Sequence, residues 1–70
     1  MALIKVVEIM ANSGKSWEDA AQNAVKQAAK TIKNIKSIYV NEQSAVVNGE
    51  NITEYRVNLK ISFEVHHEQK

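Results

Sequence analysis

Residues 55–65 decide the fold of this chain, and they read YRVNLKISFEV. Apolar and polar side chains alternate at every position, which is the two-residue period of a β-strand with one face buried and the other exposed. The sequence predicts that this strand occupies residues 51–65. The regularly extended part covers about 11 to 14 of these residues, or roughly 36–46 Å at ~3.3 Å per residue.

Another strand is predicted at residues 38–47, directly before the strand at residues 51–65; in chain order these are the second and third strands. Asn48-Gly49 follows the second strand, a dipeptide typical of β-hairpin turns. The apolar side chains of this strand change parity along its length: Ile38 and Val40 share one parity, Ala45 and Val47 the other. Because side chains alternate with a period of two, we expect a β-bulge or sharp bend within residues 41–44.

The N-terminal half predicts a strand followed by a helix. Residues 3–10 form an apolar, β-branched run typical of a strand, and residues 11–15 carry turn chemistry. Ser16 is a good N-cap, and Asp19 three residues later makes a start that resembles a capping box. We expect the helix to continue to about Ile32 or Asn34.

One face of the predicted helix is rich in alanine, which lets a helix lie close against a curved sheet. A helix of roughly 17 residues is about 25 Å long at ~1.5 Å per residue, shorter than the predicted hairpin. The helix therefore leaves part of the apolar face of the strand at residues 51–65 uncovered, and another element has to pack against it. We expect that element to be a second copy of the same chain.

Length and composition limit the function classes. Seventy residues predict a single α+β domain over residues 1–70, and a domain this small has a marginal core. The chain has no cysteine, so disulfides and thiol catalysis are excluded and oligomerisation is the simplest stabilising device. The net charge of +1 favours neither nucleic acid nor membrane as a partner. The opening apolar run meets Lys5 at once, so we expect no signal peptide and a cytoplasmic protein.

The residues that resemble known reactive motifs have simpler interpretations. Gly14-Lys15-Ser16 lies between strand and helix, as in a phosphate-binding loop, but Ile9 stands where that motif needs an earlier glycine. We therefore expect a capped turn. His66-His67 falls in a polar tail, and adjacent strand residues point to opposite faces. No spacing provides an acid, base or nucleophile, so we expect no enzyme.

Three further signals have simple structural explanations. The lysines of the helix form a basic stripe that is typical of a solvated face. Trp17, at the first helical position, is expected to anchor the core or an interface, although it could also stack on a ligand. The carboxylates are scattered, and a hard cation would have to gather them from several subunits.

Three segments taken together resemble the dodecin family. They are residues 5–9 (KVVEI), 16–20 (SWEDA) and 55–63 (YRVNLKISF), and the likeness in element order covers essentially the whole chain. The resemblance implies a three-stranded antiparallel sheet curled around one helix, with twelve copies assembled as a hollow homododecamer. It also implies a non-enzymatic role, the binding of a flavin (riboflavin or FMN) for storage, sequestration or photoprotection.

The resemblance also points to a ligand site. In flavin-binding members a tryptophan near the start of the second strand stacks on the flavin, and the matching position here is Ser37. A glutamine on the third strand contacts the flavin ring, and the matching position is Arg56. Arginine can still stack on a flat ring or pair with a phosphate. Asn41 and Asn58 complete the candidate pocket.

Two hypotheses of different classes follow. The first is a flavin-binding shell with its ligand near Ser37, Arg56, Asn41 and Asn58. The second is a flavin-free structural dodecamer that holds a cation or an anion at contacts between subunits.

Overall fold

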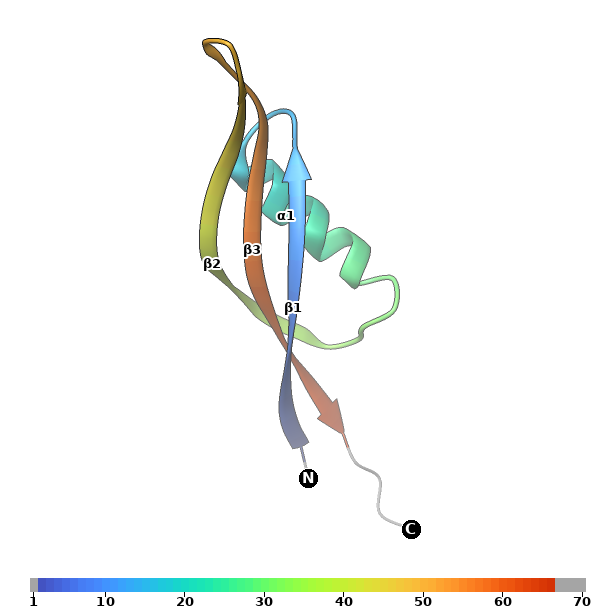
Figure 1. The fold of residues 1–70 in the computed structure, drawn as a ribbon. Helices are drawn as coiled ribbons and strands as arrows, with labels where there is room; N and C mark the ends of the chain where they lie inside the picture. The colour runs from blue at the N-terminus through green and yellow to red at the C-terminus, as the bar shows by residue number, and fades with distance from the viewer. Residues whose placement is uncertain (1, 67–70) are drawn as a thin grey trace.

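The computed structural model describes residues 2–66, in the order strand, helix, strand, strand (Figure 1). The elements are β1 (Ala2–Ser13), α1 (Trp17–Ala28), β2 (Ile35–Asn48) and β3 (Asn51–His66). The sheet order is β1-β3-β2 and both pairings are antiparallel, so β3 is the central strand. The predicted β-α-β-β fold, with one helix on a three-stranded antiparallel sheet, is confirmed.

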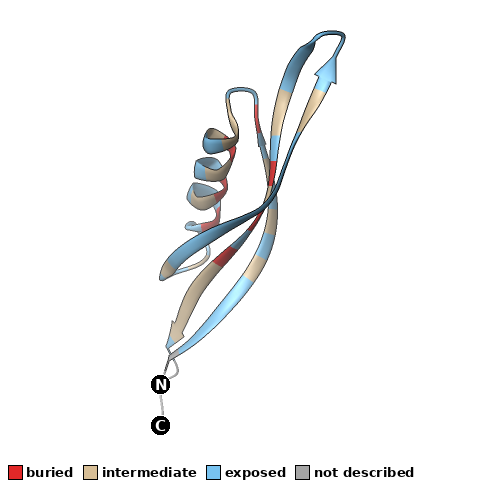
Figure 2. Ribbon diagram, turned by 90° about the vertical axis from the view of Figure 1, so that its left-hand side faces the viewer, coloured by how far each residue is buried: buried red, intermediate tan, exposed pale blue. Residues whose placement is uncertain are grey.

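The core lies between α1 and the middle of β3. The helix packs on one face of the sheet, mainly over β1 and β3, and the opposite face carries no helix (Figure 2). Small side chains on α1 allow the helix to approach the larger apolar side chains of β3 closely. The buried apolar residues are Ala20, Ala24 and Ala28 of α1, and Val57, Leu59 and Ile61 of β3.

β1 is longer than the predicted strand, which ended at residue 10. Ala11 continues the strand because its small side chain faces α1, opposite Val57. Ser13 is buried, and its hydroxyl donates to Asp19 Oδ2 at 2.6 Å. The predicted turn at residues 11–15 is therefore shorter than expected, because its polar residues have partners within the fold.

The helix begins as predicted and ends earlier than predicted. The Ser16 hydroxyl accepts a hydrogen bond from the Asp19 amide at 2.9 Å, which confirms the N-cap. The expected end at Ile32 or Asn34 is wrong, since α1 ends at Ala28. After Ala28 the amides of Lys30 and Thr31 form i→i−3 hydrogen bonds, which often close a helix end.

The loop after α1 ends at Asn34, which adopts a positive φ of 64°. Asparagine tolerates this left-handed conformation better than most residues. The Asn34 carbonyl accepts from the Glu64 amide at 3.0 Å. This contact fixes where the chain enters β2, and it explains why the helix does not continue through the loop.

The β2–β3 hairpin contains the predicted bulge. The register shifts between Val40 and Glu42, so Asn41 is the extra residue, inside the predicted segment 41–44. The turn differs by one residue from the prediction: Asn48 pairs with Asn51, and the two turn residues are Gly49 and Glu50. Gly49 takes a φ of 67°, which glycine adopts without strain.

The hairpin extends well beyond the helix (Figure 1). The Cα atoms span 60 × 19 × 12 Å, whereas the 12 residues of α1 cover about 18 Å at ~1.5 Å per residue. Val47 and Ile52, near the hairpin end, are 60% and 47% exposed. The predicted shortage of helical cover is confirmed, and these apolar side chains have no cover within residues 2–66.

Replacing Leu59 with alanine tests the core. Leu59 is fully buried against α1, so Leu59→Ala should lower the free energy of unfolding by about 2–5 kcal/mol. Leu3→Ala removes the same atoms from a side chain that is 46% exposed and should cost clearly less. Urea unfolding followed by circular dichroism measures both. Equal losses would contradict the assignment of the core.

Candidate functional site

The helix-free face of the sheet carries the candidate site, and we call it the outer face. Cross-strand partners share a face, so the register assigns side chains to it. Because Val57, Leu59 and Ile61 point toward α1, the residues between them on β3 point outward. The outer face includes Arg56, Asn58, Lys60 and Ser62 of β3, Ile4, Val6, Glu8, Met10 and Asn12 of β1, and Ser37, Tyr39, Glu42 and Ser44 of β2.

Ser37 lies near the start of β2, opposite Ser62 of β3. The two hydroxyl oxygens are 2.5 Å apart, and the Ser62 hydroxyl also approaches the Ser37 carbonyl at 3.4 Å. Both side chains are short. The position that resembles the family's stacking residue is therefore a hydroxyl pair close to the backbone, with no aromatic ring.

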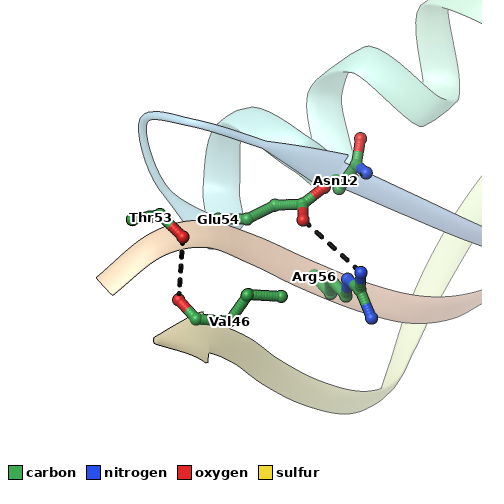
Figure 3. A network of polar contacts seen from close by, with 5 residues as sticks. All are labelled: Asn12, Val46, Thr53, Glu54 and Arg56. Carbon is green, nitrogen blue, oxygen red and sulfur yellow. Dashed lines mark hydrogen bonds and ion pairs between the residues drawn. The ribbon is translucent and has the colours of Figure 1, made fainter. Parts of the chain in front are cut away.

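Arg56 lies farther along the outer face and is held by Glu54. Its Nη2 is 3.4 Å from Glu54 Oε1, and the two side chains are 48% and 30% exposed. The other carboxylate oxygen of Glu54 accepts a hydrogen bond from Asn12 Nδ2 of β1. Figure 3 shows the carboxylate of Glu54 between Asn12 and Arg56. Sequence reasoning missed Asn12 and Glu54, because only the β1–β3 register brings them together.

The two asparagines of the candidate site differ in their surroundings. Asn58 is half-buried on the outer face, and its Oδ1 has no hydrogen-bond partner among the described residues. It lies between Met10 of β1 and Glu42 of β2. Asn41 is the exposed extra residue of the bulge, next to Glu42 in the chain. Both can offer an amide to a ligand.

One chain brings only part of the predicted site together. Arg56 and Asn58 are neighbours on β3, and Asn41 lies near Asn58 through the bulge. Ser37 is opposite Ser62, six residues from Arg56 along β3, which corresponds to about 20 Å at ~3.3 Å per residue. Ser37 and Arg56 are therefore not brought together within one chain.

Two open hollows adjoin this face at the edge of β1. The first, of 390 Å³, lies between β1 and α1. The second, of 350 Å³, is lined by Met10, Ala11, Asn12 and Arg56. Arg56 is thus beside an accessible hollow, whereas Ser37 lines neither of these two.

The other sequence signals occupy ordinary structural positions. The Ser13 hydroxyl accepts from the Lys15 amide at 2.9 Å, so the Gly14-Lys15-Ser16 turn is closed on itself. Trp17 Nε1 donates to the Ser44 carbonyl at 2.8 Å, and the indole packs edge-on against Tyr55. His66 contacts Glu64, and His67 lies outside the described residues.

Neither a metal cluster nor a membrane span occurs in the part of the chain that the structure describes. Residues 2–66 contain no group of three or more histidine, cysteine, aspartate or glutamate side chains placed to hold a metal ion. Within the same residues, no helix has the length and apolar character needed to span a bilayer.

A family model and a known protein are similar to this chain over almost its whole length. The model of the Dodecin family matches residues 3–66. The chain is 35% identical over 65 residues to the calcium dodecin of Mycobacterium tuberculosis, covering 93% of this chain and 92% of that protein. A crystal structure of that calcium-chelating protein has a TM-score of 0.79 and covers 97% of both chains.

Other solved structures agree with this fold. An arginine-to-alanine variant of the Thermus thermophilus dodecin matches with a TM-score of 0.90 at 27% identity, over 96% of this chain and 100% of that one. The dodecin of Streptomyces davaonensis matches with a TM-score of 0.88 at 23% identity, over 94% and 97%, and so supports the fold alone. Dodecins are multimeric proteins that bind small ligands. With the family model spanning residues 3–66 and these structures matching almost the whole chain, this chain belongs to the dodecin family.

Proposed function

We propose that this chain is the subunit of a homododecameric shell that binds a flavin without catalysing a reaction, in the cytoplasm. The observation that carries the proposal is that Ser37, Arg56 and Asn58 all lie on one helix-free face of the sheet. The resemblance implies ligand contact at Ser37 and Arg56, and Asn58 is a neighbour of Arg56 on the same strand. Small-ligand binding by the family supports the same assignment. Nucleic acid and membrane are not partners in this proposal.

Assembly is part of the proposed mechanism. Ser37 and Arg56 are about 20 Å apart along β3 at ~3.3 Å per residue, so one copy supplies the Ser37 end of a pocket and another supplies Arg56. The exposed apolar side chains of the hairpin end, Val47 and Ile52, offer a surface for such contacts. Flavin binding then depends on the shell being intact.

The site is weaker than one with an aromatic ring at position 37. An aromatic stack contributes about 0.5–1.5 kcal/mol beyond the area it buries, and the Ser37–Ser62 pair cannot supply it. Arg56 offers compensation, because its guanidinium can stack on a ring or bind a phosphate. Glu54 restrains Arg56 only through an exposed ion pair, which is worth about 0–1 kcal/mol.

A flavin fluorescence titration of the purified oligomer tests the proposal. Light scattering should give the mass of a dodecamer of the 7.9 kDa chain. The fluorescence of added riboflavin or FMN should be quenched, and the quenching should saturate at a fixed ratio of flavin to subunit. Ser37→Trp combined with Arg56→Gln should tighten binding, because it restores both side chains that the resemblance implies. Gln22→Ala on the exposed face of α1 is the control. An intact dodecamer that leaves flavin fluorescence unchanged contradicts the flavin assignment.

A cation at subunit contacts is the second candidate, and a specific observation favours it. Asn58 Oδ1 is a buried oxygen with no hydrogen-bond partner among the described residues, opposite Glu42. Calcium prefers such oxygen ligands, and the relative from Mycobacterium tuberculosis is a calcium dodecin. Because residues 2–66 hold no complete metal cluster, several copies would have to supply the ligands.

Calcium binding should appear as thermal stabilisation that a chelator reverses. A ligand at a hundredfold excess over its Kd adds about 2.7 kcal/mol to the folded state. Asn58→Ala should remove this gain and lower the stability of the calcium-free protein only slightly, because the buried oxygen that it deletes has no hydrogen bond to lose. Differential scanning calorimetry with calcium or with EGTA measures both effects. An equal gain for Asn58→Ala would remove Asn58 from the cation site.

A further inference from the structure

Tyr39 stands apart from the other aromatic residues of this chain. The chain contains one tryptophan, two tyrosines and one phenylalanine. Trp17 and Tyr55 pack against each other with ring centroids 4.9 Å apart, and Phe63 points to the α1 side of the sheet, like Leu59. Tyr39 is on the outer face and is 65% exposed. It is therefore the one ring that a ligand on the outer face can reach within a subunit.

Short and apolar side chains lie beside Tyr39 on the outer face. Ser37 is two residues earlier on the same strand and face, about 7 Å away at ~3.3 Å per residue. The side chains of the hydrogen-bonded Ser37–Ser62 pair are short, so they project less from the sheet than the tyrosine beside them. Val6 of β1 continues this row on the far side of Ser62 and is 56% exposed. A planar ring can therefore stack on Tyr39, lie over the Ser37–Ser62 pair and contact Val6.

A positively charged side chain lies next to Tyr39. Lys60 is directly opposite Tyr39, is exposed, and forms no ion pair within residues 2–66. Glu8 is the cross-strand partner of Lys60 on β1, but the two form no ion pair within 4.0 Å. The neighbouring charges are already engaged: Arg56 with Glu54, and Glu64 with Lys36 and His66. Lys60 is consequently the basic group best placed to meet an anion carried by a ligand on Tyr39.

From this arrangement we propose that Tyr39 is the stacking platform of the ligand site and that Lys60 binds an anionic group of the same ligand. The ligand class is a planar heteroaromatic ring with a phosphate tail, which FMN represents and riboflavin, lacking the phosphate, does not. The inference deepens the proposed flavin function. It assigns the aromatic contact to a residue two positions beyond Ser37 on the same face.

Titration of the intact oligomer with FMN and with riboflavin tests the two roles separately. Tyr39→Ala should weaken both ligands by about three- to tenfold, the loss of one aromatic stack, while Tyr39→Phe should bind like the wild type. Lys60→Gln should weaken FMN more than riboflavin and reduce the salt dependence of FMN binding. Leu3→Ala, another exposed apolar side chain, and Lys33→Gln are the matched controls.

The outcomes separate this inference from the proposed function. If the wild-type oligomer binds neither flavin, both are overturned. If it binds and Tyr39→Ala binds equally well, only the Tyr39 assignment is overturned. Should Tyr39→Ala fail to assemble by light scattering, Tyr39→Trp provides the decision, because a larger ring should tighten flavin binding and an unchanged or weaker affinity overturns the assignment. An unchanged preference for FMN over riboflavin in Lys60→Gln removes Lys60 from the site.

Discussion

The contact between the alanine face of α1 and the apolar row of β3 is the constraint on which the other features depend. Ala20, Ala24 and Ala28 are buried against Val57, Leu59 and Ile61, and no other helix covers the sheet within the described residues. The same strand carries the candidate ligand residues on its opposite face. A slip of one residue in the register would expose the core row and bury the polar row. The free energy that fixes the core therefore also fixes which side chains a ligand meets.

This contact also sets the limit of the subunit. Trp17 reaches the hairpin at the N-terminal end of α1, where its indole donates to the Ser44 carbonyl and packs against Tyr55. Beyond that point the hairpin continues without helical cover, and Val47 and Ile52 stay exposed. A chain of 70 residues has little core to spare for such exposure. The length difference between helix and hairpin is thus a physical reason for self-association, independent of the family to which the chain belongs.

Local patterns in the sequence predicted the parts of the fold that depend on local chemistry. The alternation at residues 55–65 predicted β3, and the change of parity in β2 predicted the bulge that the structure places at Asn41. The end of α1 was not predictable, because it depends on the contact of Asn34 with Glu64, 30 residues away. The site shows the same division. Ser37 and Arg56 came from the resemblance alone, whereas the hydrogen bond of Asn12 to Glu54 requires the register between β1 and β3. The shared parity of Ile38 and Val40 already puts Tyr39 on the other face, but only the register shows that Lys60 lies opposite it.

The two ends of the outer face differ in the ion pairs and hydrogen bonds that a ligand must break in order to bind. At the Arg56 end, an incoming anion competes with Glu54, which Asn12 also holds in place. The exposed ion pair is weak, worth about 0–1 kcal/mol, but freeing Arg56 leaves the charge of Glu54 beside the newly bound anion. At the Tyr39 end, Lys60 has no ion pair to break within residues 2–66, and the Ser37–Ser62 hydrogen bond can stay intact beneath a ligand. Electrostatics and hydrogen bonding therefore make the Tyr39 end the less costly place for the ligand that we propose.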